Sequence, residues 1–248
     1  MRRDELSTCL DRLLEPGRFH DYCPNGLQVE GRAEVHRVVT GVSASMAFLR
    51  AAHAAGADAV FVHHGYFWKG EDARITGMRR ARIGFLIEHC ISLYAYHLPL
   101  DAHPVLGNNA QLASRLGMKE NGRTGDQDLV CHGRLVHPCT LDEYAVRAGR
   151  ALSRMPLVIG AGDKRIERVA WCTGGAQGYF EDAIGLGVDA YVTGEISEQH
   201  VHLARESGVA FIAAGHHATE RFGVQAVGAH LVEQYGLDHC YIDDPSPV

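Results

Sequence analysis

The chain has 248 residues, of which 46% are hydrophobic and 22% are charged, and its formal net charge is −6. This length and apolar content allow one large globular domain or two small ones, and they exclude a disordered protein. A negative net charge provides no basic surface for non-specific binding of the nucleic-acid backbone. Nucleic-acid binding is therefore not indicated, and a local run such as Arg79, Arg80 and Arg82 is more often a solvated helix face.

The N-terminal segment MRRDELSTCLDRLLEP has acidic residues where a signal peptide has its apolar core, so it predicts an amphipathic surface helix. No apolar run approaches the roughly 20 residues that cross a bilayer, which argues against a membrane-spanning protein. The seven cysteines are scattered without a CxxC pair, as is typical of reduced thiols. We therefore expect a cytoplasmic protein.

Strands and helices alternate along the chain. Residues 36–64 predict a strand, an Ala-rich helix and a second strand, and a helix over 81–90 and a short strand over 91–97 follow. The same order recurs from Arg168 onward, with strands over 168–175, 188–195 and 209–217 and helices over 179–187 and 198–208. This alternation predicts an α/β fold with largely parallel sheets covered by helices on both faces.

The two halves also match in sequence, since GADAVFVHHG (56–65) lies over GVDAYVTGEI (187–196). A second block also matches, because in both halves an apolar strand leads to a histidine, three residues and a carboxylate, at His97–Asp101 and at His216–Glu220. Two aligned blocks in the same order indicate an internal duplication. The polar segment NGRTGDQDLV separates the halves, and Thr140 with Glu143 predicts a capping box at the start of the next helix. We expect two similar α/β layered domains, residues 1–125 and 126–248, with the C-terminal helix packing back on the first.

The candidate functional side chains follow the predicted strands, where ligands bind in open α/β sheets. They are His63 and His64 after AVFV, His97 and Asp101 after SLYAY, Glu195 after AYVT, and His216 and Glu220 after AFIAA. Neighbouring residues of a strand point to opposite sides, so we expect the strand to end before His63 and to turn at Gly65. Pro99 predicts a loop from His97 to Asp101, and a helix is expected to begin near Thr219.

Imidazoles and carboxylates without thiolate suit Zn²⁺, Mn²⁺, Fe²⁺ or Ni²⁺. A set of two to three imidazoles and two carboxylates, up to five protein ligands, is more than one catalytic metal needs, and it suits two metals roughly 3.5–4 Å apart that share a carboxylate and a water. Such a water becomes a hydroxide near neutral pH, with His97 or Glu195 as the proton carrier. The spacing leaves open whether His216 or the adjacent His217 is the ligand, and the other histidines are taken as ordinary polar residues.

Five motifs resemble a known family, the dinuclear-metal homologues of NGG-interacting factor three, often called GTP cyclohydrolase I type 2 homologues. The motifs are DYCPNGLQVEG from Asp21, VFVHHGYFW from Val60, YHLPLDAHPVLGNNAQLA from Tyr96, VDAYVTGE from Val188 and AAGHHATERFG from Ala213. The resemblance implies metal ligation by His63, His64, Asp101, His216 and Glu220, and so prefers His216 over His217. It places His97 beside the metals as an outer ligand or proton carrier. It also implies two intertwined α/β domains and a ring-shaped homohexamer.

The resemblance further implies a metal-dependent hydrolase that acts on GTP or a related nucleotide. The chain lacks a Walker-type phosphate loop, because Thr173-Gly174-Gly175 is short and no lysine follows it. Triphosphate binding would then depend on the metals and on arginines such as Arg74, Arg79 or Arg221. The alternative is a non-enzymatic metal-binding ring or scaffold linked to the DNA-damage response. A purely structural metal site is disfavoured, because such sites are usually closed and rich in cysteine.

Overall fold

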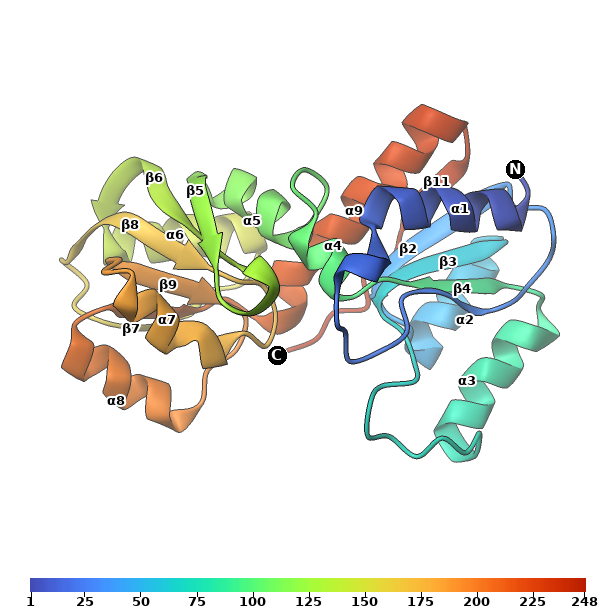
Figure 1. Ribbon diagram of the computed structural model, residues 1–248, viewed down its shortest axis with the longest axis horizontal. Helices are drawn as coiled ribbons and strands as arrows, with labels where there is room; N and C mark the ends of the chain where they lie inside the picture. Colours follow the sequence, from blue (N-terminus) through green and yellow to red (C-terminus); the bar gives the residue numbers. More distant parts are fainter. The chain divides into compact units, whose positions relative to one another are not determined.

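The computed structural model describes residues 1–248 (Figure 1). The helices are α1 (Arg3–Leu14), α2 (Met46–Ala54), α3 (Gly77–Glu88), α4 (Leu98–Ala102), α5 (Asn108–Leu116), α6 (Leu141–Leu152), α7 (Phe180–Gly185), α8 (Glu198–Ser207) and α9 (His216–Tyr235). The strands are β1 (Gly26–Val29), β2 (Arg37–Ser43), β3 (Ala59–His64), β4 (Ser92–Ala95), β5 (Met118–Thr124), β6 (Val130–Thr140), β7 (Leu157–Ile159), β8 (Arg165–Trp171), β9 (Ala190–Thr193), β10 (Ala210–Ala213) and β11 (Asp238–Tyr241). No helix has both the length and the apolar character needed to cross a membrane.

The contacts divide the chain into two compact units. The first unit comprises Met1–Gly107 and Gly223–Pro245, and the second comprises Asn108–Phe222 and Ser246–Val248. Helix α9 therefore contributes its first residues to the second unit and the remainder to the first. The division expected between residues 125 and 126 differs from this one, because β5 and β6 pair across that point, with Arg123 opposite Cys131.

The first unit is a five-stranded sheet in the order β1-β4-β3-β2-β11. Strands β11, β2, β3 and β4 run parallel, and β1 closes one edge antiparallel to β4. Alternate residues of β2 and β3 face opposite sides: Val38 and Phe61 pack with α1 and α9, while Val39 and Val60 pack with α2 and α3. Figure 1 shows α1 and α9 on one side of this sheet and α2 and α3 on the other. The predicted N-terminal helix is confirmed as α1, which buries Leu6, Leu10 and Leu14 at helical spacing.

The second unit is a six-stranded sheet in the order β5-β6-β8-β9-β10-β7. Its centre, β8-β9-β10, is parallel, and the outer strands β6 and β7 are antiparallel to it. Helices α5 and α6 cover one face around the buried Trp171, and on the other face Phe180 of α7 packs on Phe211 with ring centroids 4.8 Å apart. The predicted capping box of Thr140 and Glu143 is confirmed at the start of α6.

The two units repeat one arrangement, β-α-β-α-β with parallel strands, and the expected α/β layers are confirmed. A shared detail supports duplication. One carboxylate oxygen of Asp58 accepts hydrogen bonds from the backbone N–H groups of His36 and Arg37, at the start of β2. Asp189 accepts the same pair of bonds from Glu167 and Arg168, in β8. Each aspartate precedes one strand, β3 or β9, and ties it to the neighbouring strand at the point where the parallel pairing of the two begins.

Candidate metal centre

In the first unit the candidate residues follow the carboxyl ends of the parallel strands. His63 and His64 are the last residues of β3, and their ring centroids are 4.6 Å apart. The side-chain nitrogens of His63, His64 and His97 can be chosen so that all lie within 4.8 Å of one another. The expectation that the strand ends before His63 is wrong: β3 continues through His64. Each ring is held by a neighbouring strand, His63 through the carbonyl of Tyr96 after β4 and His64 through Ser43 of β2.

Gly65 has a different role from the expected turn. A Cβ at Gly65 would overlap Oε1 of Gln28 and the Cβ of Ala95. Gln28 uses that oxygen to accept the backbone N–H of Tyr66 at 2.7 Å. The glycine therefore allows the chain after the histidine pair to pass close to β1 and β4.

Asp101 lies in a helix and not in a loop, which corrects the expectation based on Pro99. Pro99 occupies the first turn of α4, where a missing N–H breaks no helical hydrogen bond. The turn begins at His97, whose carbonyl accepts the N–H of Leu100 at 2.9 Å. Asp101 is thereby brought back toward β3, and its Oδ1 lies 3.5 Å from Nε2 of His63.

His97 is held by a residue that sequence reasoning did not single out. Nδ1 of His97 lies 2.7 Å from Oδ1 of Asp21, and the other carboxylate oxygen accepts the N–H of Leu98 and a bond from Asn25. Burial raises the pKa of the Asp21 carboxyl, but the hydrogen bond and charge of His97 outweigh it, so this pKa lies below its usual value. The signal for Asp21 was its position in the motif DYCPNGLQVEG.

Cys23 also lies near Asp21 and His97, within reach of a shared ion. Burial, with a smaller contribution from the charge of Asp21, raises the pKa of its thiol to about 12. A thiol that keeps its proton is a poor metal ligand, because the thiolate is the coordinating form. The donor set of the first unit therefore consists of imidazole and carboxylate.

In the second unit, His216 and Glu220 share one face of a helix. Helix α9 begins at His216, earlier than the expected start near Thr219, because Thr219 donates its N–H and its hydroxyl to the carbonyl of Gly215. His216 and Glu220 are then one turn apart, and Nε2 of His216 lies 3.1 Å from Oε2 of Glu220. His217, on a different face, donates its backbone N–H to the carbonyl of Val248.

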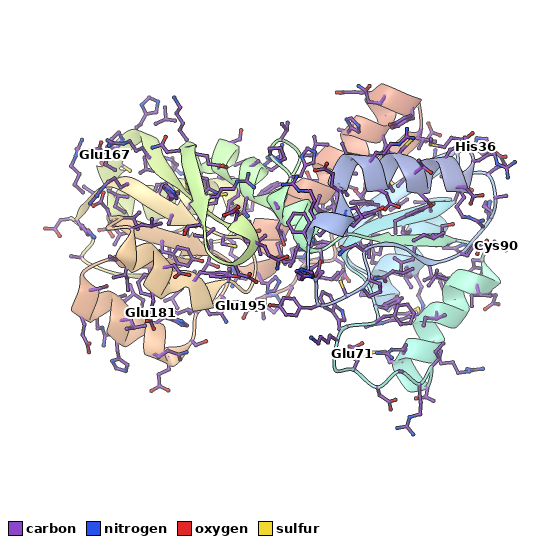
Figure 2. The ribbon with its side chains drawn as sticks, viewed as in Figure 1. His36, Glu71, Cys90, Glu167, Glu181 and Glu195 are labelled. Atoms are coloured by element: carbon purple, nitrogen blue, oxygen red, sulfur yellow. The ribbon has the colours of Figure 1, made fainter.

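Glu195 lies in the loop between β9 and α8 and is labelled in Figure 2. Its Oε1 is 2.6 Å from Nδ1 of His216. Burial lowers the pKa of His216, but the hydrogen bonds and charges of Glu220 and Glu195 outweigh it and raise the pKa to about 9. Two carboxylates beside the His216 imidazole thus favour a positive charge on this ring.

Gly174 allows the chain after β8 to approach the same group. It has a positive φ of 70°, and a Cβ there would overlap Oε1 of Glu220 and lie 3.2 Å from Nε2 of His216. Its N–H donates to the hydroxyl of Thr219 at 3.0 Å. The Thr173-Gly174-Gly175 segment is therefore packed against α9 and does not form a phosphate loop.

The histidines of both units fit a metal in the same way. In each ring Nδ1 is hydrogen-bonded within its own unit: His63 to the carbonyl of Tyr96, His64 to Ser43, His97 to Asp21 and His216 to Glu195. The carbonyl or carboxylate partners of His63, His97 and His216 only accept, so they keep the proton on Nδ1 and make Nε2 the coordinating nitrogen. The Ser43 hydroxyl can donate or accept, so it holds the His64 ring without fixing its tautomer. Two ligands that each lie about 2.0–2.2 Å from one ion are roughly 3–3.5 Å from each other. The distances from Nε2 to the carboxylate oxygen, 3.5 Å for His63 and Asp101 and 3.1 Å for His216 and Glu220, suit such a pair.

The arginines considered for triphosphate binding have partners of their own. Arg74 pairs with Asp72 at 2.6 Å, and Arg79 pairs with Glu71. Arg221 donates to the carbonyl of Leu152 at 2.9 Å. None of these bonds connects an arginine to the imidazole and carboxylate groups described above.

Comparison with known proteins adds to this picture. The model of one protein family, Duf34/NIF3 (NGG1p interacting factor 3), matches residues 1–247. The chain belongs to the Duf34/NIF3 family. A family relative from Pseudomonas aeruginosa, named GTP cyclohydrolase 1 type 2 homolog, is 55% identical over 240 residues, which cover 96% of this chain and 95% of the relative.

Solved structures of similar proteins share the fold over the whole chain. A structural-genomics structure, of protein ybgI of unknown function, has a TM-score of 0.96 and 49% identity and covers 100% of both chains. A crystal structure of a protein from Thermus thermophilus has a TM-score of 0.91 and 37% identity, again over 100% of both chains. The family resemblance inferred from the sequence motifs is therefore confirmed.

Proposed function

We propose that this member of the Duf34/NIF3 family is a dinuclear metal-dependent hydrolase. His63, His64 and Asp101 of the first unit and His216 and Glu220 of the second would hold two divalent ions per subunit, as Zn²⁺, Mn²⁺, Fe²⁺ or Ni²⁺. The observation that carries the proposal is shared by both units: an imidazole with its Nδ1 fixed turns Nε2 toward a carboxylate. That arrangement is typical of ligand histidines.

When bound, such ions supply Lewis acidity and lower the pKa of water toward neutrality. The protein's own groups would position the ligands and move protons. His97 stands beside the His63 and His64 rings, with its Nδ1 on the buried Asp21, and in our proposal it carries protons to and from the reacting atoms. Glu195 acts through His216, whose ring it orients.

The proposed substrate is GTP or a related nucleotide. Its support is the name shared by curated relatives at 50–55% identity, GTP cyclohydrolase 1 type 2 homolog, together with a donor set suited to hydrolysis. The assembly we propose is a homohexamer, which light scattering of the purified protein would measure directly.

The first test is elemental analysis of the isolated protein and of His64→Ala and Glu220→Ala. Two metals per subunit are expected in the parent and one or none in each variant. His137→Ala and Glu206→Ala replace exposed residues of the same types and should keep both metals. Metal content unchanged in Glu220→Ala would refute the ligand assignment.

The second test is turnover. Metal-stripped protein reconstituted in turn with Mn²⁺, Zn²⁺, Fe²⁺ and Ni²⁺ should hydrolyse GTP or another member of a nucleotide panel. Full metal content without turnover on the whole panel would contradict the hydrolase proposal. It would favour the alternative, a non-enzymatic metal-binding ring or scaffold linked to the DNA-damage response, for which a pull-down with parent and Glu220→Ala would test whether partners depend on metal.

A further inference from the structure

Two aromatic side chains of the first unit approach the His97 ring. The Trp68 indole meets it edge to face, with centroids 5.0 Å apart and an interplanar angle of 84°, and it also lies 6.0 Å from the ring of His64. Tyr22 lies 6.4 Å from His97 at an angle of 65°. The metal-binding candidates of this unit are therefore bordered by aromatic rings.

Neither Trp68 nor Tyr22 belongs to the buried core. Trp68 is half-buried, Tyr22 is 57% exposed, and neither the indole N–H nor the phenol hydroxyl makes a hydrogen bond within the protein. The other tryptophan behaves differently: Trp171 is fully buried and donates its indole N–H to the carbonyl of Asn109 at 3.1 Å. Large aromatic residues left partly exposed beside a polar site are typical of ligand binding.

The backbone holds the two residues in place. The N–H of Lys69, next to Trp68, donates to the carbonyl of Tyr22 at 2.6 Å, and the N–H of Tyr22 donates to Asp21. The chain enters Trp68 through Phe67, which has a positive φ of 66°. Because Asp21 also holds His97, the same local structure fixes both the imidazole and the aromatic side chains.

We propose that Trp68 and Tyr22 form a binding subsite for a planar aromatic ring of the substrate, stacked on the Trp68 indole. The proposal rests on the proposed function and deepens it by naming the residues that would bind the heteroaromatic ring of the substrate. Stacking on an aromatic face accepts any planar ring and orients it without a charge. A ring seated there would lie against His97 and His64, beside the ligands of the first unit.

Tryptophan fluorescence provides a direct measurement. The chain has two tryptophans, and only Trp68 is accessible, so quenching by a ligand reports on this subsite. We expect guanosine and adenosine to quench the emission of the metal-loaded protein saturably. Ribose 5-phosphate and tripolyphosphate, which have no ring to stack, should leave it unchanged. Equal quenching by tripolyphosphate would overturn the proposal.

Variants test the subsite by equilibrium dialysis with radiolabelled guanosine. Trp68→Ala should weaken binding roughly ten- to hundredfold and Tyr22→Ala less, while Trp68→Phe, which keeps a stacking face, should remain within a few fold of the parent. Tyr235→Ala, at another exposed tyrosine, is the matched control and should bind normally. Unchanged binding by Trp68→Ala would refute the subsite. If this variant instead changed its molecular mass in light scattering and kept its guanosine binding, the aromatic side chains would be a contact between copies of the chain, which would also refute the subsite.

Metal content, measured on every variant, separates the two proposals. Ring binding by a parent protein that takes up no metal on reconstitution would support the subsite while contradicting the dinuclear site. Metals that are retained by Trp68→Ala together with lost ring binding would support both.

Discussion

Oε1 of Glu195 lies 2.6 Å from Nδ1 of His216, and the opposite nitrogen of the same ring faces Glu220 across 3.1 Å. A carboxylate behind a ligand histidine fixes the ring and raises its basicity, and removing such a partner typically weakens metal binding about 10- to 100-fold. We expect Glu195→Gln to weaken metal binding by this factor, measured by competition with a chelating dye. Glu198→Gln, in the first turn of α8, replaces an exposed glutamate nearby and should have no effect. Normal metal affinity with reduced turnover would instead make Glu195 a direct proton carrier.

Gly174→Ala should displace Glu220, because the added Cβ would overlap Oε1 of Glu220. The positive φ of 70° adds a backbone cost of about 1–2 kcal/mol for a residue with a side chain. The expected result is fewer metals per subunit and a lower free energy of unfolding in urea. Gly178→Ala is the control, because a Cβ there meets nothing within 4 Å. Full metal content in Gly174→Ala would show that the close approach is dispensable.

Asp58→Ala and Asp189→Ala should destabilise their units by similar amounts, since each carboxylate accepts two backbone N–H groups of the neighbouring strand where parallel pairing begins. Leaving such donors unsatisfied costs about 1–3 kcal/mol. Hydrogen exchange should show faster exchange at His36 and Arg37 in the first variant and at Glu167 and Arg168 in the second. Asp163→Ala, at an exposed aspartate, serves as the reference. If Asp58→Ala and Asp189→Ala lost no more free energy of unfolding than this variant, the role assigned to the two carboxylates would be contradicted.

His239 predicts an acid-sensitive component of stability. Its Nε2 lies 2.9 Å from the Thr40 hydroxyl, and burial lowers its pKa below the ordinary 6.5. The unfolded chain therefore binds this proton more readily, so the free energy of unfolding should decrease as the pH falls below about 6.5, until the folded-state pKa is passed. Urea titrations from pH 8 to pH 5 should show a shallower decrease for His239→Gln than for the parent. His137→Gln, at an exposed histidine, should follow the parent. The same dependence of the free energy of unfolding on pH in all three proteins would contradict the prediction.

Much of the local structure followed from sequence patterns. The apolar runs that became β3 and β9 were predicted as strands, because alternating or continuous apolar residues between turn signals are a local property. The errors occurred where local rules compete. Pro99 was interpreted as a helix breaker although the first turn tolerates it, and His63 and His64 were expected to lie beyond the strand that contains them.

The partners of the candidate ligands were less accessible to sequence reasoning. Asp21 and His97 are 76 positions apart, and Ser43 and His64 are 21 apart. Such pairs depend on which strands become neighbours, and hydrophobic periodicity does not specify sheet order. The partly exposed aromatic rings of Tyr22 and Trp68 became notable only when they were found beside His97.

By itself, the sequence determined the alternation of strands and helices, the repeated α/β unit, the family and the imidazole-carboxylate chemistry, because these depend on residue type and near-neighbour spacing. Tertiary structure alone decided the sheet orders, the division of the chain at Gly107, and the group that holds each Nδ1. Those features arise from packing between distant segments. Burial and strand register, rather than local propensity, determine which of many possible groups becomes the hydrogen-bond partner of each histidine.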